Sequence, residues 1–187
     1  MTSGAGRTLM LLRHAKSAWP DVPDHERPLA ARGRRDAAAI GRWLSDGHIP
    51  DQVVCSTARR ARQTWQIAQR ILGSAPAVVF DDRAYEASAP QLLDLIRRAP
   101  AAAGILLIVG HDPALPELAC TLAEAASKPG AGAGNGGASA EMLVRMRVKF
   151  PTAAVAVFES AGDWARLGPE RTRLVRFVTP RELQARQ

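Results

Sequence analysis

Short apolar runs alternate along the first two thirds of this chain with longer segments whose apolar residues recur at helical spacing, and this alternation most constrains the fold. The apolar runs predict buried strands at residues 8–13, 52–55, 77–80 and 105–109. The segments between and after them predict helices at 29–45, 58–72, 88–98 and 115–124. Strands that alternate with helices through short connections form crossover units, so we expect an α/β fold with a mostly parallel central sheet flanked by helices.

The remainder of the chain predicts two further strands and one irregular segment. Residues 153–159 and 173–178 are apolar or alternating, which is typical of strands. Residues 127–140 contain five glycines and almost no bulky apolar side chain, so they predict a flexible surface loop. The pattern at 141–150 is mixed and assigns no element. Because 187 residues suit one core, and the part after the loop is too short to fold alone, we expect a single domain over 1–187.

Two of the predicted strands end on residues that carry chemistry. The first ends on Arg13-His14, and another ends on Gly110-His111, followed by Asp112 and Pro113. In open α/β sheets, ligands bind outside the carboxyl ends of the strands. An arginine and two imidazoles at one edge indicate an anion site, and phosphate is the commonest anion that needs both a fork-shaped donor and a nucleophile.

A third strand is followed by a Ser-Thr turn and the start of a helix, where phosphate binds readily. Three arginines, Arg59, Arg60 and Arg62, compete there for a role as phosphate ligand. The apolar stripe of the helix passes through 61, 65, 68 and 72, which leaves Arg59 nearly opposite and Arg62 well off the stripe. Arg60 lies closest to the edge of the stripe, so we expect Arg60 to reach inward and the other two to be solvated.

Charge and composition exclude several other classes. The net charge of +7 is spread over several segments with few aromatic residues, so we expect solvated helix faces and an electropositive site, not a nucleic-acid surface. No apolar run is long enough to cross a bilayer, and the run after Arg7 is too short for a secretion signal. Cys55 and Cys120 have no recognisable spacing and predict buried, inert thiols. We therefore expect a cytoplasmic protein with no membrane partner.

Three segments resemble the histidine phosphatase superfamily, also called phosphoglycerate-mutase-like: LLRHAKS at 11–17, STARRARQT at 56–64 and VGHDP at 109–113. The RHAKS form, ERPLAARG at 26–33 and YEAS at 85–88 resemble its small SixA-type phosphohistidine phosphatase branch. The resemblance covers nearly the whole chain except the glycine-rich loop. It implies a three-layer sandwich of the phosphoglycerate-mutase type. One departure is Ala15, which stands where the family often has glycine after the nucleophile.

The resemblance also implies a phosphate pocket made of Arg13, His14, Arg60 and His111, in which His14 is transiently phosphorylated. Because no cluster of carboxylates suggests a two-metal phosphatase, we expect no metal or other cofactor to take part. Lys16 and Ser17 are expected at the pocket mouth as substrate-binding residues, although a solvated lysine would explain Lys16 equally well.

Glu86 has two equally weighted interpretations. It could be the general acid that alkyl phosphate esters require, or a carboxylate that favours the N-terminus of the next helix.

The resulting hypothesis is a phosphatase that removes a phosphoryl group through a phosphohistidine on His14, with phosphohistidine in a protein as its substrate. One alternative is a phosphatase or phosphomutase that acts on small phosphate esters with the same pocket. Another is a phosphoprotein-binding module without catalysis. The short chain, with no large insertion that would enclose a substrate, favours an open site for a protein-borne phosphoryl group. The sequence leaves the physiological substrate and the oligomeric state open.

Overall fold

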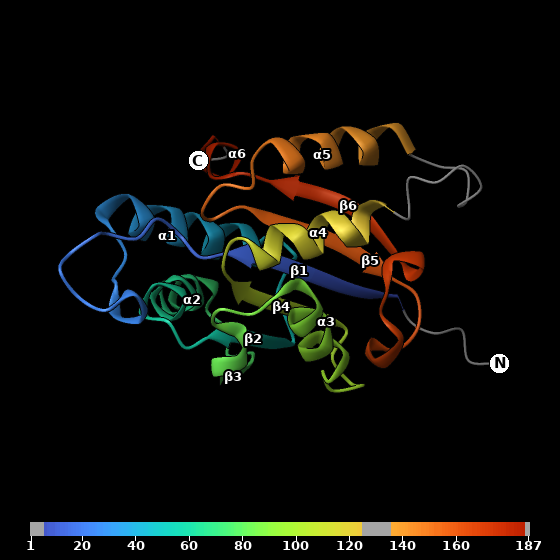
Figure 1. The fold of residues 1–187 in the computed structure, drawn as a ribbon, viewed down its shortest axis with the longest axis horizontal. Helices are drawn as coiled ribbons and strands as arrows, with labels where there is room; N and C mark the ends of the chain where they lie inside the picture. Colours follow the sequence, from blue (N-terminus) through green and yellow to red (C-terminus); the bar gives the residue numbers. More distant parts are fainter. Residues whose placement is uncertain (1–5, 125–135, 186–187) are drawn as a thin grey trace.

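A single six-stranded sheet forms the centre of the molecule in the computed structural model, which describes residues 6–124 and 136–185. The strands lie in the order β3-β2-β4-β1-β5-β6 (Figure 1). Their bounds are β1 Arg7–Arg13, β2 Gln52–Ser56, β3 Ala77–Asp81, β4 Ile105–Gly110, β5 Val155–Ser160 and β6 Thr172–Val178. Only β5 runs against its neighbours, so the predicted, mostly parallel sheet is confirmed.

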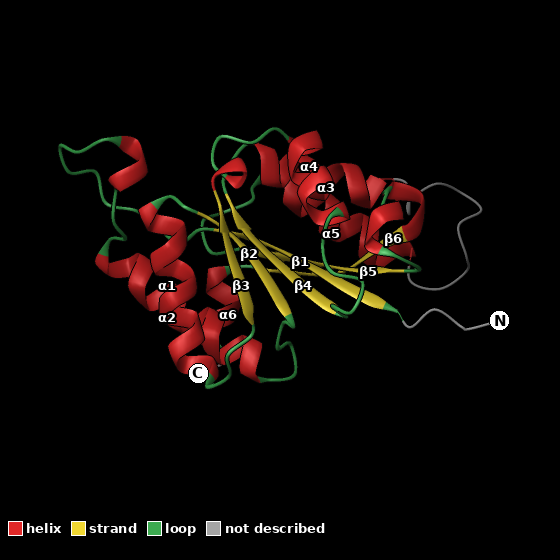
Figure 2. Cartoon of the chain, turned by 90° about the horizontal axis from the view of Figure 1, so that it is seen from below, coloured by secondary structure: helices red, strands yellow, loops and turns green. Residues whose placement is uncertain are grey.

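Helices cover both faces of the sheet and complete the three layers (Figure 2). On one face lie α1 (Ala31–Ser45), α2 (Arg59–Leu72) and α6 (Pro180–Gln184). On the other lie α3 (Ala89–Arg97), α4 (Ala114–Glu124) and α5 (Gly136–Val148). The three-layer α/β sandwich expected from the sequence is therefore present. No helix among these described residues is both long and apolar enough to span a bilayer.

The central strand β1 feeds two separate cores because its side chains alternate between the faces of the sheet. Leu9 and Leu11 pack with the apolar side chains of α3, α4 and α5. Met10 and Leu12 pack instead with those of α1 and α2. All four side chains are fully buried. This burial on both faces fixes the register of β1, and with it the position of the residues that follow its carboxyl end.

Gly33 places α1 directly against the loop that follows β1. A Cβ at this position would overlap the carbonyl oxygen of Lys16, so only glycine permits the contact. Gly41, two turns further along α1, lies against the backbone of α2, where a Cβ would come within 2.5 Å of the carbonyl oxygen of Ala68. These two approaches hold α1 against both the β1–α1 loop and the second half of α2.

The glycine-rich loop predicted at 127–140 is too long at its C-terminal end. Residues 136–140 form the first turns of α5, which continues through most of the stretch that the sequence left unassigned. Residues 127–135 lie outside the described part of the chain. The sequence does not predict this helix because its small residues give it almost no amphipathic pattern. Tertiary contacts hold it in place, and one of them is the hydrogen bond that Ser139 donates to the carbonyl oxygen of Leu174 in β6.

Candidate active site

The carboxyl ends of β1 and β4 bring two histidines together. Arg13 pairs with Gly110 in the parallel register, so His14 and His111 leave the sheet side by side. Their ring centroids lie 5.0 Å apart with an interplanar angle of 51°. Both side chains are buried. The long loop that leads from β1 to α1 projects from the carboxyl end of β1 (Figure 1). The parallel pairing of two strands thus explains a cluster whose members are far apart in sequence.

Arg60 joins this cluster from the first turn of α2. Its Nε lies 3.3 Å from Nε2 of His14, and its side chain is buried. Arg59 and Arg62, the other two arginines of that turn, are exposed. The apolar face of α2, with Ala61 and Trp65 fully buried, sets this orientation.

Hydrogen bonds to His14 define which of its two ring nitrogens can react. Nδ1 lies 2.8 Å from the carbonyl oxygen of Ala15, so Nδ1 carries the hydrogen, and the lone pair is on Nε2, which faces Arg60. Burial lowers the pKa of His14 to about 4, and the charges of Arg60 and Arg13 act in the same direction. The imidazole is therefore neutral at neutral pH, and its Nε2 accepts a hydrogen bond from Nε of Arg60.

His111 is held by a hydroxyl from the end of β2. Its Nε2 lies 2.8 Å from Oγ of Ser56, which also accepts a hydrogen bond from the amide of Ala58. The Ser56 hydroxyl can then donate to Nε2, which leaves the hydrogen on Nδ1. Burial lowers the pKa of His111 to about 3, with a further contribution from His14. His111 is thus a neutral donor with one nitrogen fixed.

Two donors of this cluster are buried without a partner, namely Nδ1 of His111 and Nε of Arg13. The rest of the Arg13 guanidinium is engaged, because Nη1 donates to the carbonyl oxygen of Phe150 and Nη2 pairs with Asp112 at 3.0 Å. Unpaired buried donors are uncommon in folded proteins and call for an explanation. An oxyanion is a suitable acceptor for donors of this kind, and the positive charge of the site favours one.

Three further residues belong to the site that sequence reasoning did not identify: Asp24, Arg27 and Tyr85. Asp24 pairs with Arg60 at 2.9 Å and with Arg27 at 2.7 Å, and the Tyr85 hydroxyl donates to it at 2.9 Å. Partial burial alone would raise the pKa of Asp24, but hydrogen bonds from Arg27 and Tyr85 and the charge of Arg60 outweigh it and lower the pKa to about 2. Arg27 and Tyr85 lie in motifs quoted above, whereas no pattern in the sequence marks Asp24.

The two residues expected at the pocket mouth differ in their surroundings. Lys16 is exposed. Ser17 is buried, and its Oγ accepts a hydrogen bond of 2.7 Å from Nη2 of Arg27. The contacts of Ser17 therefore lie with Arg27, and a direct contact of either residue with substrate stays a prediction.

Glu86 is exposed and lies beside the cluster. It lines a cleft of about 460 Å³ together with His111 and with residues at the starts of α3 and α4. Its backbone has φ 54°, a left-handed conformation that is uncommon for residues other than glycine. Such strained positions concentrate at functional sites. The cleft thus connects Glu86 with His111.

Among the residues that the structure describes, no group of three or more His, Cys, Asp or Glu side chains could hold a metal ion. The two cysteines are free. Cys55 is buried inside β2, and Cys120 is partly buried on α4.

Comparisons with known proteins agree on one family. The model of the histidine phosphatase superfamily (branch 1) matches residues 9–92. An uncharacterised protein of Mycobacterium tuberculosis is 41% identical over 182 residues, which cover 91% of this chain and all of that protein.

Two solved structures resemble nearly the whole chain. A protein of Nakamurella multipartitia assigned as phosphohistidine phosphatase SixA is 34% identical, with a TM-score of 0.78 over 94% of this chain and 96% of the other. A protein of Agrobacterium tumefaciens with the same assignment is 30% identical, with a TM-score of 0.72 over 93% of this chain and 98% of the other.

Proposed function

Since the chain belongs to the histidine phosphatase superfamily, in its SixA-like branch, and is therefore a phosphatase, we propose that it transfers a phosphoryl group from phosphohistidine in a protein to His14 and then to water. One observation supports this most strongly. Nδ1 of His14 is tied to the Ala15 carbonyl, and Nε2 is neutral, buried and directed at the Arg60 guanidinium. A nucleophile held in one tautomer beside a cationic fork is what attack on phosphorus requires.

In the first step, Nε2 of His14 attacks phosphorus and a new N–P bond forms as the N–P bond of the substrate breaks. The substrate imidazole, protonated on its other nitrogen, leaves as a neutral imidazole and takes no proton from the enzyme. Arg13 and Arg60 hold the phosphoryl oxygens, and Nδ1 of His111 donates to the same group. These donors stabilise the charge that spreads over the oxygens in the transition state.

In the second step, water attacks the phosphoryl group on His14, the N–P bond to His14 breaks, and inorganic phosphate leaves. The phosphate takes both hydrogens of the attacking water and leaves as H2PO4⁻, so His14 is left neutral with its hydrogen on Nδ1. The same four side chains serve both steps, and His14 returns to its starting state. No metal or other cofactor is assigned a part in this scheme.

The leaving group favours a phosphohistidine substrate. An alkoxide leaves poorly without a proton, whereas a protonated phosphoimidazole releases a neutral ring. The two relatives of 34% and 30% identity carry the same assignment, which supports this substrate class for the present chain.

One observation favours the alternative of small phosphate esters, because Glu86 and His111 line the same cleft. A carboxylic acid there could protonate an alkoxide leaving group.

A turnover panel tests the proposal. It compares a phosphohistidine protein, phosphoramidate, an aryl phosphate and sugar phosphates with one enzyme preparation. We expect the phosphohistidine protein to have the highest kcat/KM. Efficient turnover of a sugar phosphate with no measurable action on the phosphohistidine protein would contradict the proposed substrate and favour the ester alternative.

A further inference from the structure

Asp24 is the acidic residue that connects the two sides of the candidate site. It begins the short 3-10 helix Asp24–Glu26 in the loop between β1 and α1. Its Oδ2 accepts hydrogen bonds from Nη2 of Arg60 at 2.9 Å and from the Tyr85 hydroxyl at 2.9 Å. Its Oδ1 accepts one from Nη1 of Arg27 at 2.7 Å. Both carboxylate oxygens are thus engaged by side chains from three separate segments.

The hydrogen bonds of Arg60 divide its guanidinium between Asp24 and His14. Nη1 donates to the backbone carbonyl of Asp24 at 2.7 Å, and Nη2 donates to its carboxylate. Nε, on the other side of the group, faces Nε2 of His14 at 3.3 Å. A guanidinium has five N–H donors in one plane, so fixing two of its nitrogens fixes the direction of the others.

From this geometry we propose that Asp24 is a positioning residue for phosphoryl transfer, which holds Arg60 so that its remaining N–H groups point at the oxygens of the phosphoryl group that His14 attacks. The inference rests on the proposed function, because it assigns Asp24 a task in that reaction. Each Nη nitrogen of Arg60 keeps a second hydrogen, so the pairing with Asp24 leaves donors for a phosphoryl group.

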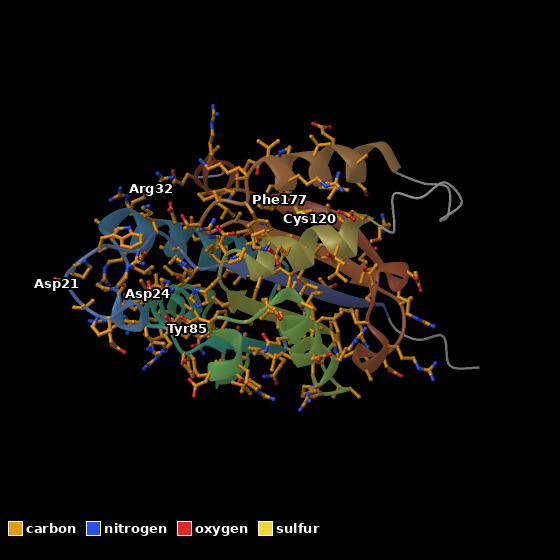
Figure 3. All side chains as sticks on the ribbon, in the orientation of Figure 1. Asp21, Asp24, Arg32, Tyr85, Cys120 and Phe177 are labelled. Atoms are coloured by element: carbon orange, nitrogen blue, oxygen red, sulfur yellow. The ribbon has the colours of Figure 1, made fainter. Side chains whose placement is uncertain are left out.

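Tyr85 extends the same arrangement to the other histidine. Its ring lies edge-on to His111 with centroids 5.5 Å apart, and edge-on to His25 at 4.8 Å. Because the Tyr85 hydroxyl is tied to Asp24, one carboxylate fixes both the arginine beside His14 and the aromatic ring beside His111. Figure 3 shows Asp24 and Tyr85 close together, while Asp21 lies farther out on the same loop.

The direct test is Asp24→Ala, with Asp21→Ala as the matched control. Asp21 is an exposed carboxylate of the same loop, so the control removes the same charge. We expect kcat for phosphoramidate to fall on the order of tenfold in Asp24→Ala, because misplacing a catalytic group by a fraction of an ångström has effects of this size. KM should change less than kcat, since the lost contact acts on the transition state. The backbone carbonyl of Asp24 still binds Arg60, which limits the loss.

A double-mutant cycle separates positioning from general damage. If Asp24 acts through Arg60, then adding Asp24→Ala to Arg60→Ala should cause no further loss of activity. The affinity of the same four proteins for tungstate, a phosphate mimic, can be measured by calorimetry and provides a second double-mutant cycle that does not depend on turnover. There we expect Asp24→Ala to weaken binding in the wild-type background and to leave it unchanged in Arg60→Ala.

Three results would overturn the inference. The first is a kcat of Asp24→Ala equal to that of Asp21→Ala. The second is a loss of kcat on adding Asp24→Ala to Arg60→Ala that is as large as the loss in the wild-type background. The third is a fall in the kcat of Asp24→Ala that only matches the decrease in its folded fraction, measured by thermal unfolding. If the wild-type protein turns over phosphoramidate and the variants give any of these results, only the positioning role of Asp24 is contradicted, and the proposed function stands. A wild-type protein that neither binds tungstate nor turns over any substrate contradicts the proposed function as well.

Discussion

Nε2 of His14 lies 3.3 Å from Nε of Arg60, although 46 residues separate them in the sequence. The contact joins the end of β1 to the first turn of α2, and through it the unprotonated nitrogen of a neutral imidazole accepts a hydrogen bond from the proposed phosphate-binding guanidinium. Nε2 can accept this hydrogen bond because the ring hydrogen is on the other nitrogen, Nδ1, where the carbonyl oxygen of Ala15 holds it.

Replacing His14 with alanine should abolish turnover of every substrate while the protein stays folded. The reason is that no other residue of the cluster is placed as the nucleophile. Steady-state kinetics and thermal unfolding measure the two properties, and His48→Ala serves as the control because His48 stacks on Trp43, away from the cluster. A His14→Ala variant with near wild-type rates would contradict the mechanism.

The two adjacent arginines of α2 should respond very differently to substitution. Arg60→Ala removes a charge-assisted contact to the phosphoryl group, and we expect kcat/KM to fall on the order of a hundredfold. Arg59→Ala removes an equal charge from an exposed position and should stay close to wild type. Equal losses in the two variants would mean that the bulk positive charge, and not a directed contact, supports the reaction.

The stability of the fold should decrease as the pH falls below the ordinary range of histidine. Burial lowers the pKa of His14 to about 4 and that of His111 to about 3, below the value near 6.5 of an unfolded histidine. Between these limits the unfolded chain binds more protons, so stability is full above pH 6.5 and is lost as the pH falls toward 4. We expect the Tm difference between pH 7 and pH 5 to be smaller in His14→Asn. An unchanged difference would contradict the buried, neutral state of His14.

The Glu86→Gln variant tests the remaining ambiguity of the site, since it keeps the shape but cannot donate a carboxylic proton. If Glu86 is a general acid, alkyl phosphate hydrolysis should slow by roughly a hundredfold, while an aryl phosphate and a phosphohistidine barely respond. If Glu86 only favours the start of α3, all substrates should change alike and weakly. Glu117→Gln, an exposed glutamate lining the same cleft, is the matched control.

Chelation should leave the activity unchanged, because the proposed pocket consists of arginines and histidines. Kinetics before and after dialysis against EDTA measure this. Complete loss that added metal restores would contradict the proposed reaction scheme.

The sequence predicted those parts of the candidate site that depend on local pattern. The ends of two apolar runs identified Arg13, His14 and His111, since neighbouring parallel strands deliver their following residues to one edge. Helical periodicity distinguished Arg60 from Arg59, because one side of α2 must be buried.

What escaped prediction depends on long-range contacts or unusual backbone. Asp24 acquires its importance only when the β1–α1 loop meets α2, 36 residues away. Strand β5 begins at Val155 and not at the predicted Ala153, because Ala153 has a left-handed φ of 66° and its amide donates to the carbonyl oxygens of Arg13 and His14. Neither feature leaves a periodic pattern in the sequence.

The most direct test of the account is to trap the covalent intermediate. The enzyme is mixed with phosphoramidate, quenched in alkali during turnover, digested and examined by mass spectrometry. We predict a phosphoryl group on His14, absent from His14→Ala and retained at reduced occupancy in Arg60→Ala. Phosphorylation of another residue, or steady turnover with no phosphorylated His14 at any quench time, would contradict nucleophilic catalysis by His14.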